Sequence, residues 1–166
     1  MKLLLVRHAI ALDRDTPGVS DDLRPLTEEG ASRFKKVARA LGALVTADLV
    51  LTSPLLRAKQ TAEILARQWT AVATHEAEPL GNGSRAQFEE TLARLSNSKV
   101  VVAVGHEPHL SSWVADWLGA PQGETFAFKK GAAALIDFDD GVGEGAGRLV
   151  FFLPPKVLKD LLDNLG

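Results

Sequence analysis

Two arginines and two histidines in this sequence are of the types that bind and transfer phosphate. Arg7 and His8 are adjacent in "LLLVRHAIA", Arg57 lies in "SPLLRA", and His106 lies in "GHEP". The planar guanidinium donors of arginine match phosphate oxygens, and their charge does not titrate away. Nearby cations disfavour protonation of a histidine, so its imidazole stays neutral and can attack phosphorus. The four residues together predict a phosphoryl-transfer site.

Each of the four also has an ordinary structural interpretation when it is taken alone. Arg7 could be solvated at a sheet edge, and Arg57 could lie on a solvated helix face. His8 could be a structural histidine, and His106 could cap a helix. The functional interpretation therefore depends on whether the fold brings all four to one place.

The segments that carry these residues alternate between strands and helices. Apolar runs predict strands, and apolar residues at helical spacing predict helices. We expect strands at 2–6, 49–51, 71–78 and 99–104, and helices at 27–45, 53–69, 85–95 and 108–118. Further strands are expected at 132–138 and 148–153, joined by a mobile glycine-rich loop, and a helix at 154–166.

This alternation predicts one domain, residues 1–166, with a layered α/β fold and a largely parallel central sheet flanked by helices. Ligands of such sheets bind at the carboxyl ends of the strands. Arg7 with His8, then Arg57, then His106 each follow a predicted strand, so all should lie at the same edge.

Residues with known preferences for helix ends mark where the helices begin. Thr27 and Ser53 are expected to be N-caps, and Pro54 and Pro108 the first helical residues. Gly119 should end the helix that contains Trp113 and Trp117, two tryptophans that we expect in the core.

The overall composition excludes several classes of protein. The net charge of −2 gives no reason to expect a nucleic acid or an anionic membrane as partner. Without cysteine there is no disulfide, zinc–thiolate site or thiol nucleophile. The apolar run at Leu3–Val6 is too short for a signal peptide, so we expect a cytoplasmic protein.

Three segments resemble the signature segments of the histidine phosphatase superfamily and occur in the same order. They are "LVRHA", in which Ala9 takes the glycine position of an Arg-His-Gly motif, "TSPLLRAKQTAEIL" and "VGHEP". The short chain and "LRPLTEEG" are similar to the small SixA-type phosphohistidine phosphatases. The resemblance covers most of the first 120 residues and implies a three-layer sandwich of the phosphoglycerate mutase-like type.

The resemblance implies a covalent, two-step phosphatase that needs no metal or other cofactor. His8 would be the nucleophile and become phosphohistidine, which water then hydrolyses. Arg7, Arg57 and His106 would hold the phosphoryl oxygens, with His106 acting best as imidazolium. Arg24 matches a further phosphate-binding arginine of the SixA type. The implied partner is a protein that carries phosphohistidine, as in signal transduction.

The general acid is left unassigned among Glu78, Asp21 and Asp22, and an ordinary surface carboxylate is the favoured interpretation of each. Expelling an alkoxide, whose conjugate acid has a pKa of roughly 15, needs an acid more than expelling an imidazole, with a pKa of about 6.5. We therefore predict a preference for P–N bonds. Little of the 166 residues is available for a lid, and an open pocket could admit a protein histidine.

Three rival functions remain. A small-molecule phosphomonoester phosphatase or mutase would use the same residues, although a mutase should need more enclosing structure. A non-catalytic module that binds phosphate or a phosphoprotein would not need both His8 and His106. A metal hydrolase is disfavoured because His106 and His109 lack the i, i+4 spacing of a zinc-binding helix. The sequence suggests no partner for His75. It also leaves the oligomeric state open.

Overall fold

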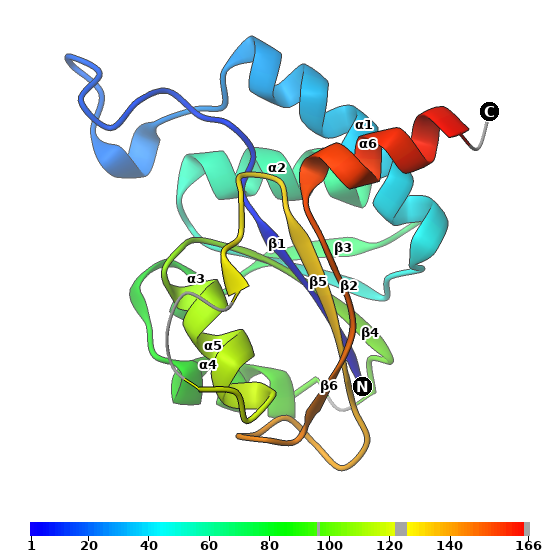
Figure 1. Ribbon diagram of the computed structural model, residues 1–166. Helices are drawn as coiled ribbons and strands as arrows, with labels where there is room; N and C mark the ends of the chain where they lie inside the picture. Colours follow the sequence, from blue (N-terminus) through cyan, green and yellow to red (C-terminus); the bar gives the residue numbers. More distant parts are fainter. Residues whose placement is uncertain (96, 122–125, 165–166) are drawn as a thin grey trace.

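The computed structural model describes residues 1–95, 97–121 and 126–164, which form a six-stranded sheet with helices on both faces (Figure 1). The strand order is β3-β2-β4-β1-β5-β6. The first four strands in this order are parallel, and β5 and β6 are antiparallel to their neighbours. The expected α/β sandwich with a largely parallel sheet is confirmed. The strands are β1 (Lys2–Arg7), β2 (Leu49–Thr52), β3 (Ala73–Glu76), β4 (Val100–Gly105), β5 (Ala133–Phe138) and β6 (Gly147–Leu153).

The helices form one layer on each face of the sheet (Figure 1). One layer contains α1 (Glu28–Leu44), α2 (Leu56–Ala66) and α6 (Pro155–Asn164). The other contains α3 (Pro79–Asn82), α4 (Arg85–Ala93) and α5 (His109–Trp117). A 3₁₀ turn, η1 (Asp21–Leu23), lies in the long connection between β1 and α1. None of the helices in the described ranges is long and apolar enough to cross a membrane.

Apolar and polar residues do not alternate along β1 because the strand is buried on both faces. Leu4 and Val6 pack in the core against α1 and α2, whereas Leu3 and Leu5 pack in the core against α4 and α5. All four are fully buried. A strand covered on both sides has no solvent face on which polar residues would recur. This central strand therefore delivers its last residue, Arg7, to a fixed position at the carboxyl edge.

Two of the predicted helix starts are wrong. Helix α2 begins at Leu56 rather than Pro54, and Ser53 is not its N-cap. The Ser53 hydroxyl accepts the Leu55 N–H at 3.2 Å within the preceding turn and contacts His106, so it is not available to a later helical N–H. In α5, Pro108 is the N-cap and His109 the first helical residue.

Other local predictions are confirmed. The Thr27 hydroxyl accepts the Gly30 N–H at 2.9 Å and caps α1. Gly119 follows α5 with φ of +63°, a conformation that favours glycine, and Trp117 is fully buried. One local prediction is wrong: the sequence "EPLGNGS", residues 78–84, favours a loop, but Pro79–Asn82 form the short helix α3. The glycine-rich connection between β5 and β6 is held at Gly145, whose N–H donates to the Asp116 carbonyl at 2.9 Å.

Candidate active site

The residues with phosphate-binding chemistry meet at the carboxyl ends of three neighbouring strands. Arg7 ends β1 and His8 follows it, Arg57 lies in the first turn of α2 after β2, and His106 follows β4. Together with Arg24 they line one cavity of about 210 Å³. The others lining it are Asp13, Arg14, Glu107 and Lys130. Arginines and lysine outnumber carboxylates in this lining by three, an excess that suits a phosphate dianion.

His8 is held by the main chain around it. Its N–H donates to the Gly105 carbonyl at 3.1 Å, and the Gly131 N–H donates to its carbonyl at 3.2 Å. The next N–H, of Ala9, donates to the Thr61 hydroxyl on α2 at 3.0 Å. The segment after β1 is therefore tied to β4, to the start of β5 and to α2, which fixes the direction of the imidazole.

The imidazole of His8 has one nitrogen available as a nucleophile. Its Nδ1 lies 2.7 Å from the Ala9 carbonyl oxygen. Because a carbonyl oxygen only accepts, Nδ1 carries the hydrogen and the lone pair of the neutral ring is on Nε2. Burial, with help from the charges of His106, Arg57 and Arg7, lowers the pKa of His8 to about 3. The ring is therefore neutral at physiological pH, as attack on phosphorus requires.

His106 lies beside His8, with ring centroids 5.0 Å apart and ring planes at 49°. Its Nε2 is 2.8 Å from the Ser53 hydroxyl oxygen. Burial and the Arg57 charge lower the pKa of His106 to about 4. The ring is thus neutral at pH 7 in this structure, whereas the resemblance implied an imidazolium. A dianionic phosphoryl group beside it would favour the protonated form.

Arg7 and Arg57 present guanidinium groups whose donors are only partly used. Arg7 Nη1 donates to the Phe128 carbonyl at 2.6 Å. Burial lowers the pKa of both arginines, but each has an opposing carboxylate, Glu107 for Arg7 and Asp21 for Arg57. Within the described residues, the Nε atoms of both arginines and Nδ1 of His106 are buried and have no hydrogen-bond partner. Buried donors without a partner are costly unless a ligand satisfies them, and phosphoryl oxygens would do so.

None of the three candidate acids is placed as a proton donor. Burial opposes ionisation of Asp21, but hydrogen bonds and charges from Arg24 and Arg57 outweigh it and lower its pKa to about 2. Asp21 therefore carries no proton at neutral pH. Asp22 and Glu78 are exposed and do not line the cavity.

The sequence interpretation missed Glu107, which does line the cavity. Its Oε1 accepts the Phe128 N–H at 2.8 Å and its Oε2 accepts the Ser111 hydroxyl at 2.5 Å. Both oxygens thus accept hydrogen bonds, and the bond from Phe128 holds the residue whose carbonyl receives Arg7. Its place directly after His106 in "GHEP" was the available signal. The role of Ser53 as partner of His106 was missed as well.

The other two histidines lie apart from this arrangement. His109 is stacked on Trp113, with centroids 5.7 Å apart, and does not line the cavity. His75 is exposed on the edge strand β3. In the part of the chain that the structure describes, no group of three or more His, Asp or Glu residues is placed to hold a metal ion.

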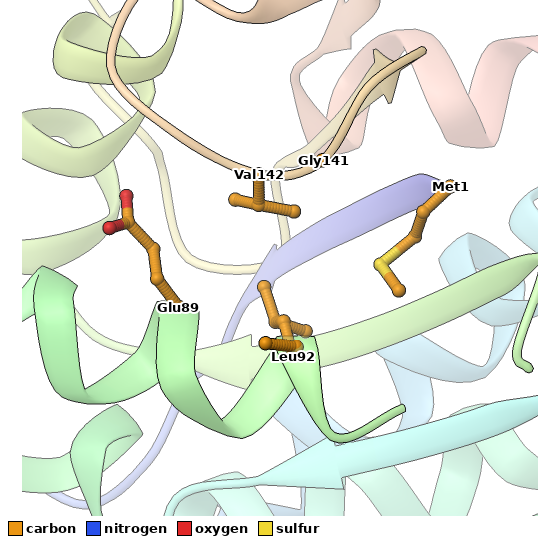
Figure 2. A pocket seen from close by; sticks show the side chains of 6 residues that line it. Met1, Glu89, Leu92, Gly141 and Val142 are labelled. Atoms are coloured by element: carbon orange, nitrogen blue, oxygen red, sulfur yellow. The ribbon is translucent and has the colours of Figure 1, made fainter. Parts of the chain in front are cut away.

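A larger cavity, of about 390 Å³, lies at the opposite end of the sheet (Figure 2). The side chains of Met1, Leu92 and Val142 line it, and Glu89 stands at one side. Glu89 already accepts hydrogen bonds from Arg85 and from the Trp117 indole. This cavity lacks the arginines and histidines that phosphate would need, so we place the candidate active site at the carboxyl edge.

Comparisons with known proteins show the family of this chain. A family model described as the histidine phosphatase superfamily (branch 1) matches residues 3–81. An uncharacterized protein of Picosynechococcus sp. is 37% identical over 155 residues, which are 90% of this chain and 88% of that protein.

Solved structures extend the match over nearly the whole chain. The protein histidine phosphatase SixA, solved with tungstate, is 27% identical with a TM-score of 0.81, over 96% of this chain and 100% of that one. The alpha-ribazole phosphatase of Shigella flexneri shares the fold at 22% identity, with a TM-score of 0.68 over 90% of this chain and 95% of that one. The chain therefore belongs to the histidine phosphatase superfamily, within which it is SixA-like, and it is a phosphatase.

Proposed function

We propose that this phosphatase removes the phosphoryl group from phosphohistidine on a protein, through a phosphohistidine formed on its own His8. The observation that carries the proposal is the state of the His8 ring. The ring is neutral, its Nδ1–H is committed to the Ala9 carbonyl, and His8 lines a cavity rich in guanidinium groups, which leaves the Nε2 lone pair for attack. Such a ring is suited to attack on phosphorus.

The first step exchanges one P–N bond for another. Nε2 of His8 attacks phosphorus, and the bond to the substrate nitrogen breaks with its electron pair. The substrate ring carries a hydrogen on its other nitrogen, so it departs as neutral imidazole and needs no further proton. Arg7, Arg57 and His106 hold the three phosphoryl oxygens, and their unpartnered donors gain partners as charge develops there.

The second step regenerates the enzyme. Water attacks the phosphorus of the phosphorylated His8 from the side opposite the ring, in line with the bond that breaks. The electron pair of that bond returns to Nε2, the proton of water passes to solvent, and phosphate leaves. No step needs a metal ion.

A P–N substrate is favoured because none of the three candidate acids is placed to protonate a leaving group. Asp21 is ionised, Asp22 and Glu78 do not line the cavity, and both Glu107 oxygens accept hydrogen bonds. An imidazole leaves without such an acid far more readily than an alkoxide, whose conjugate acid has a pKa of roughly 15 against about 6.5.

Trapping of the phosphorylated enzyme tests this proposal. Brief reaction with a ³²P-phosphohistidine protein should leave label that resists alkali and is lost in acid. The His8→Ala variant should carry no label, whereas His75→Ala, which changes an exposed histidine outside the site, should label normally. Turnover should persist in excess chelator.

Substrate comparison tests the preference for P–N bonds. The ratio of kcat/KM for the phosphohistidine protein to that for an alkyl phosphate should be well above one. Equal or faster turnover of the ester would contradict the preference and support a small-molecule phosphomonoesterase. Label retained by His8→Ala would contradict the mechanism itself.

A further inference from the structure

Asp21 lies among three arginines at the rim of the candidate active site. Its Oδ1 accepts from Arg24 Nε at 3.0 Å, from Arg24 Nη2 at 2.7 Å and from Arg14 Nε at 3.3 Å. Its Oδ2 accepts from Arg57 Nη2 at 3.1 Å, and its main-chain carbonyl accepts from Arg57 Nη1 at 2.6 Å. One residue therefore fixes the guanidinium groups of both Arg24 and Arg57.

The two inner arginines need a shared counter-ion. The side chains of Arg24 and Arg57 are only 9% and 5% exposed, so water does little to screen their mutual repulsion. The Asp21 side chain is 42% exposed and reaches both from the solvent side. A carboxylate between two buried cations offsets their repulsion and sets the angle at which each guanidinium stands.

The bonds to Asp21 leave other donors of these arginines unused. A guanidinium group has five N–H donors. Arg57 uses one on each Nη for Asp21, and its Nε is buried with no partner in the described residues. Arg24 gives three N–H donors to Asp21 and to the Leu12 carbonyl. The contacts with Asp21 therefore set the directions in which the remaining N–H donors of the Arg24 and Arg57 guanidinium groups point.

We propose that Asp21 is a positioning residue that orients Arg24 and Arg57 for the phosphoryl oxygens while itself staying out of contact with phosphate. The proposal deepens the proposed function and rests on it for its meaning, but it concerns anion binding and is testable without turnover. A simple electrostatic view gives the opposite expectation. A carboxylate beside an anion site repels phosphate, so its removal should strengthen binding.

The test compares Asp21→Asn with Asp22→Asn, using inorganic phosphate as the probe and calorimetry as the measurement. Both variants remove one negative charge from the same short turn, but Asp22 is exposed and, unlike Asp21, forms no ion pair with Arg24 or Arg57. An asparagine at 21 offers one acceptor and would face one of the arginines with an amide donor. We expect Asp21→Asn to weaken phosphate binding by roughly tenfold or more, the loss typical of a charge-assisted hydrogen bond, and Asp22→Asn to leave it unchanged.

Two further measurements separate positioning from a structural role of the turn. Asp21→Glu keeps the carboxylate and should recover part of the affinity and of kcat/KM. In an Arg24→Ala background, Asp21→Asn should cost less than in the wild type, because the part of its effect that passes through Arg24 is already lost and only the part through Arg57 remains. A structural role of the turn would give additive losses and no recovery by glutamate.

Phosphate binding by Asp21→Asn that is unchanged or tighter would overturn the proposal, as would equal effects of the two asparagine variants. Failure of the proposed function has a different signature. In that case the wild type binds phosphate and shows the Asp21 effect but forms no phosphohistidine on His8.

Discussion

Replacing His8 with asparagine should remove a defined part of the pH dependence of folding stability. The pKa of this buried histidine is about 3 in the folded protein, against about 6.5 for an unperturbed histidine. Between these pH values the unfolded chain binds a proton that the folded chain does not. The contribution of the buried, neutral His8 to the free energy of unfolding is therefore complete above pH 6.5 and is lost as pH falls toward 3.

The magnitude follows from the two pKa values. At pH 5 the unfolded chain gains about 2 kcal/mol from protonation of His8, whereas the folded chain gains almost nothing. The side chain is 6% exposed, so solvent screening reduces this figure little. His106, with a pKa of about 4 and similar burial, adds about 2 kcal/mol by the same reasoning.

Urea unfolding at pH 8 and pH 5, followed by tryptophan fluorescence, measures the effect. The free energy of unfolding of the wild type should fall by about 2 kcal/mol more between these pH values than that of His8→Asn. Asparagine can still donate to the Ala9 carbonyl, which keeps the local main chain in place. His75→Asn, at an exposed position, should match the wild type. An equal fall for His8→Asn and the wild type would refute burial of a neutral imidazole at this site.

Three other substitutions have expected outcomes. Ser53→Ala removes the partner of His106 Nε2 and should lower kcat/KM by roughly tenfold in steady-state kinetics. Urea unfolding should show a free energy of unfolding lower by only about 1 kcal/mol. Gly30→Ala would place a Cβ against the Ile10 carbonyl oxygen, so urea unfolding should show a free energy of unfolding lower by about 1–3 kcal/mol. The control is Gly143→Ala, whose Cβ would meet no neighbouring atom and should cause no such clash. Trp117→Ala empties a fully buried site and should cost about 3–5 kcal/mol in the same assay; a loss below 1 kcal/mol would contradict its place in the core.

The order of elements was predictable because each depends on local patterns. The unbroken apolar runs of β1 and β4 indicated strands covered on both faces, and the Thr27 cap and Gly119 indicated helix ends. The start of α2 was not predictable in the same way. The Ser53 hydroxyl has an ordinary capping preference, but its contact with His106 comes from a segment 53 residues away.

The candidate active site likewise combines features that local sequence indicates with features that depend on tertiary contacts. The meeting of Arg7, His8, Arg57 and His106 in one cavity could be predicted from the sequence, because parallel strands place their carboxyl ends at one edge. The role of Asp21 could not, since a carboxylate near an arginine in sequence is usually only solvated. Its bridge between Arg24 and Arg57 depends on the tertiary contact with Arg57, 36 residues away.

The sequence by itself determined the elements, their order in the chain and the types of side chain that follow each strand, because these depend on neighbours within a few residues. Only the tertiary structure decided which nitrogen of His8 is free, that both histidines are neutral, and that Asp21 joins Arg24 to Arg57. Protonation and the direction of hydrogen bonds depend on burial and on charges within a few ångströms, and those neighbours come from distant parts of the chain.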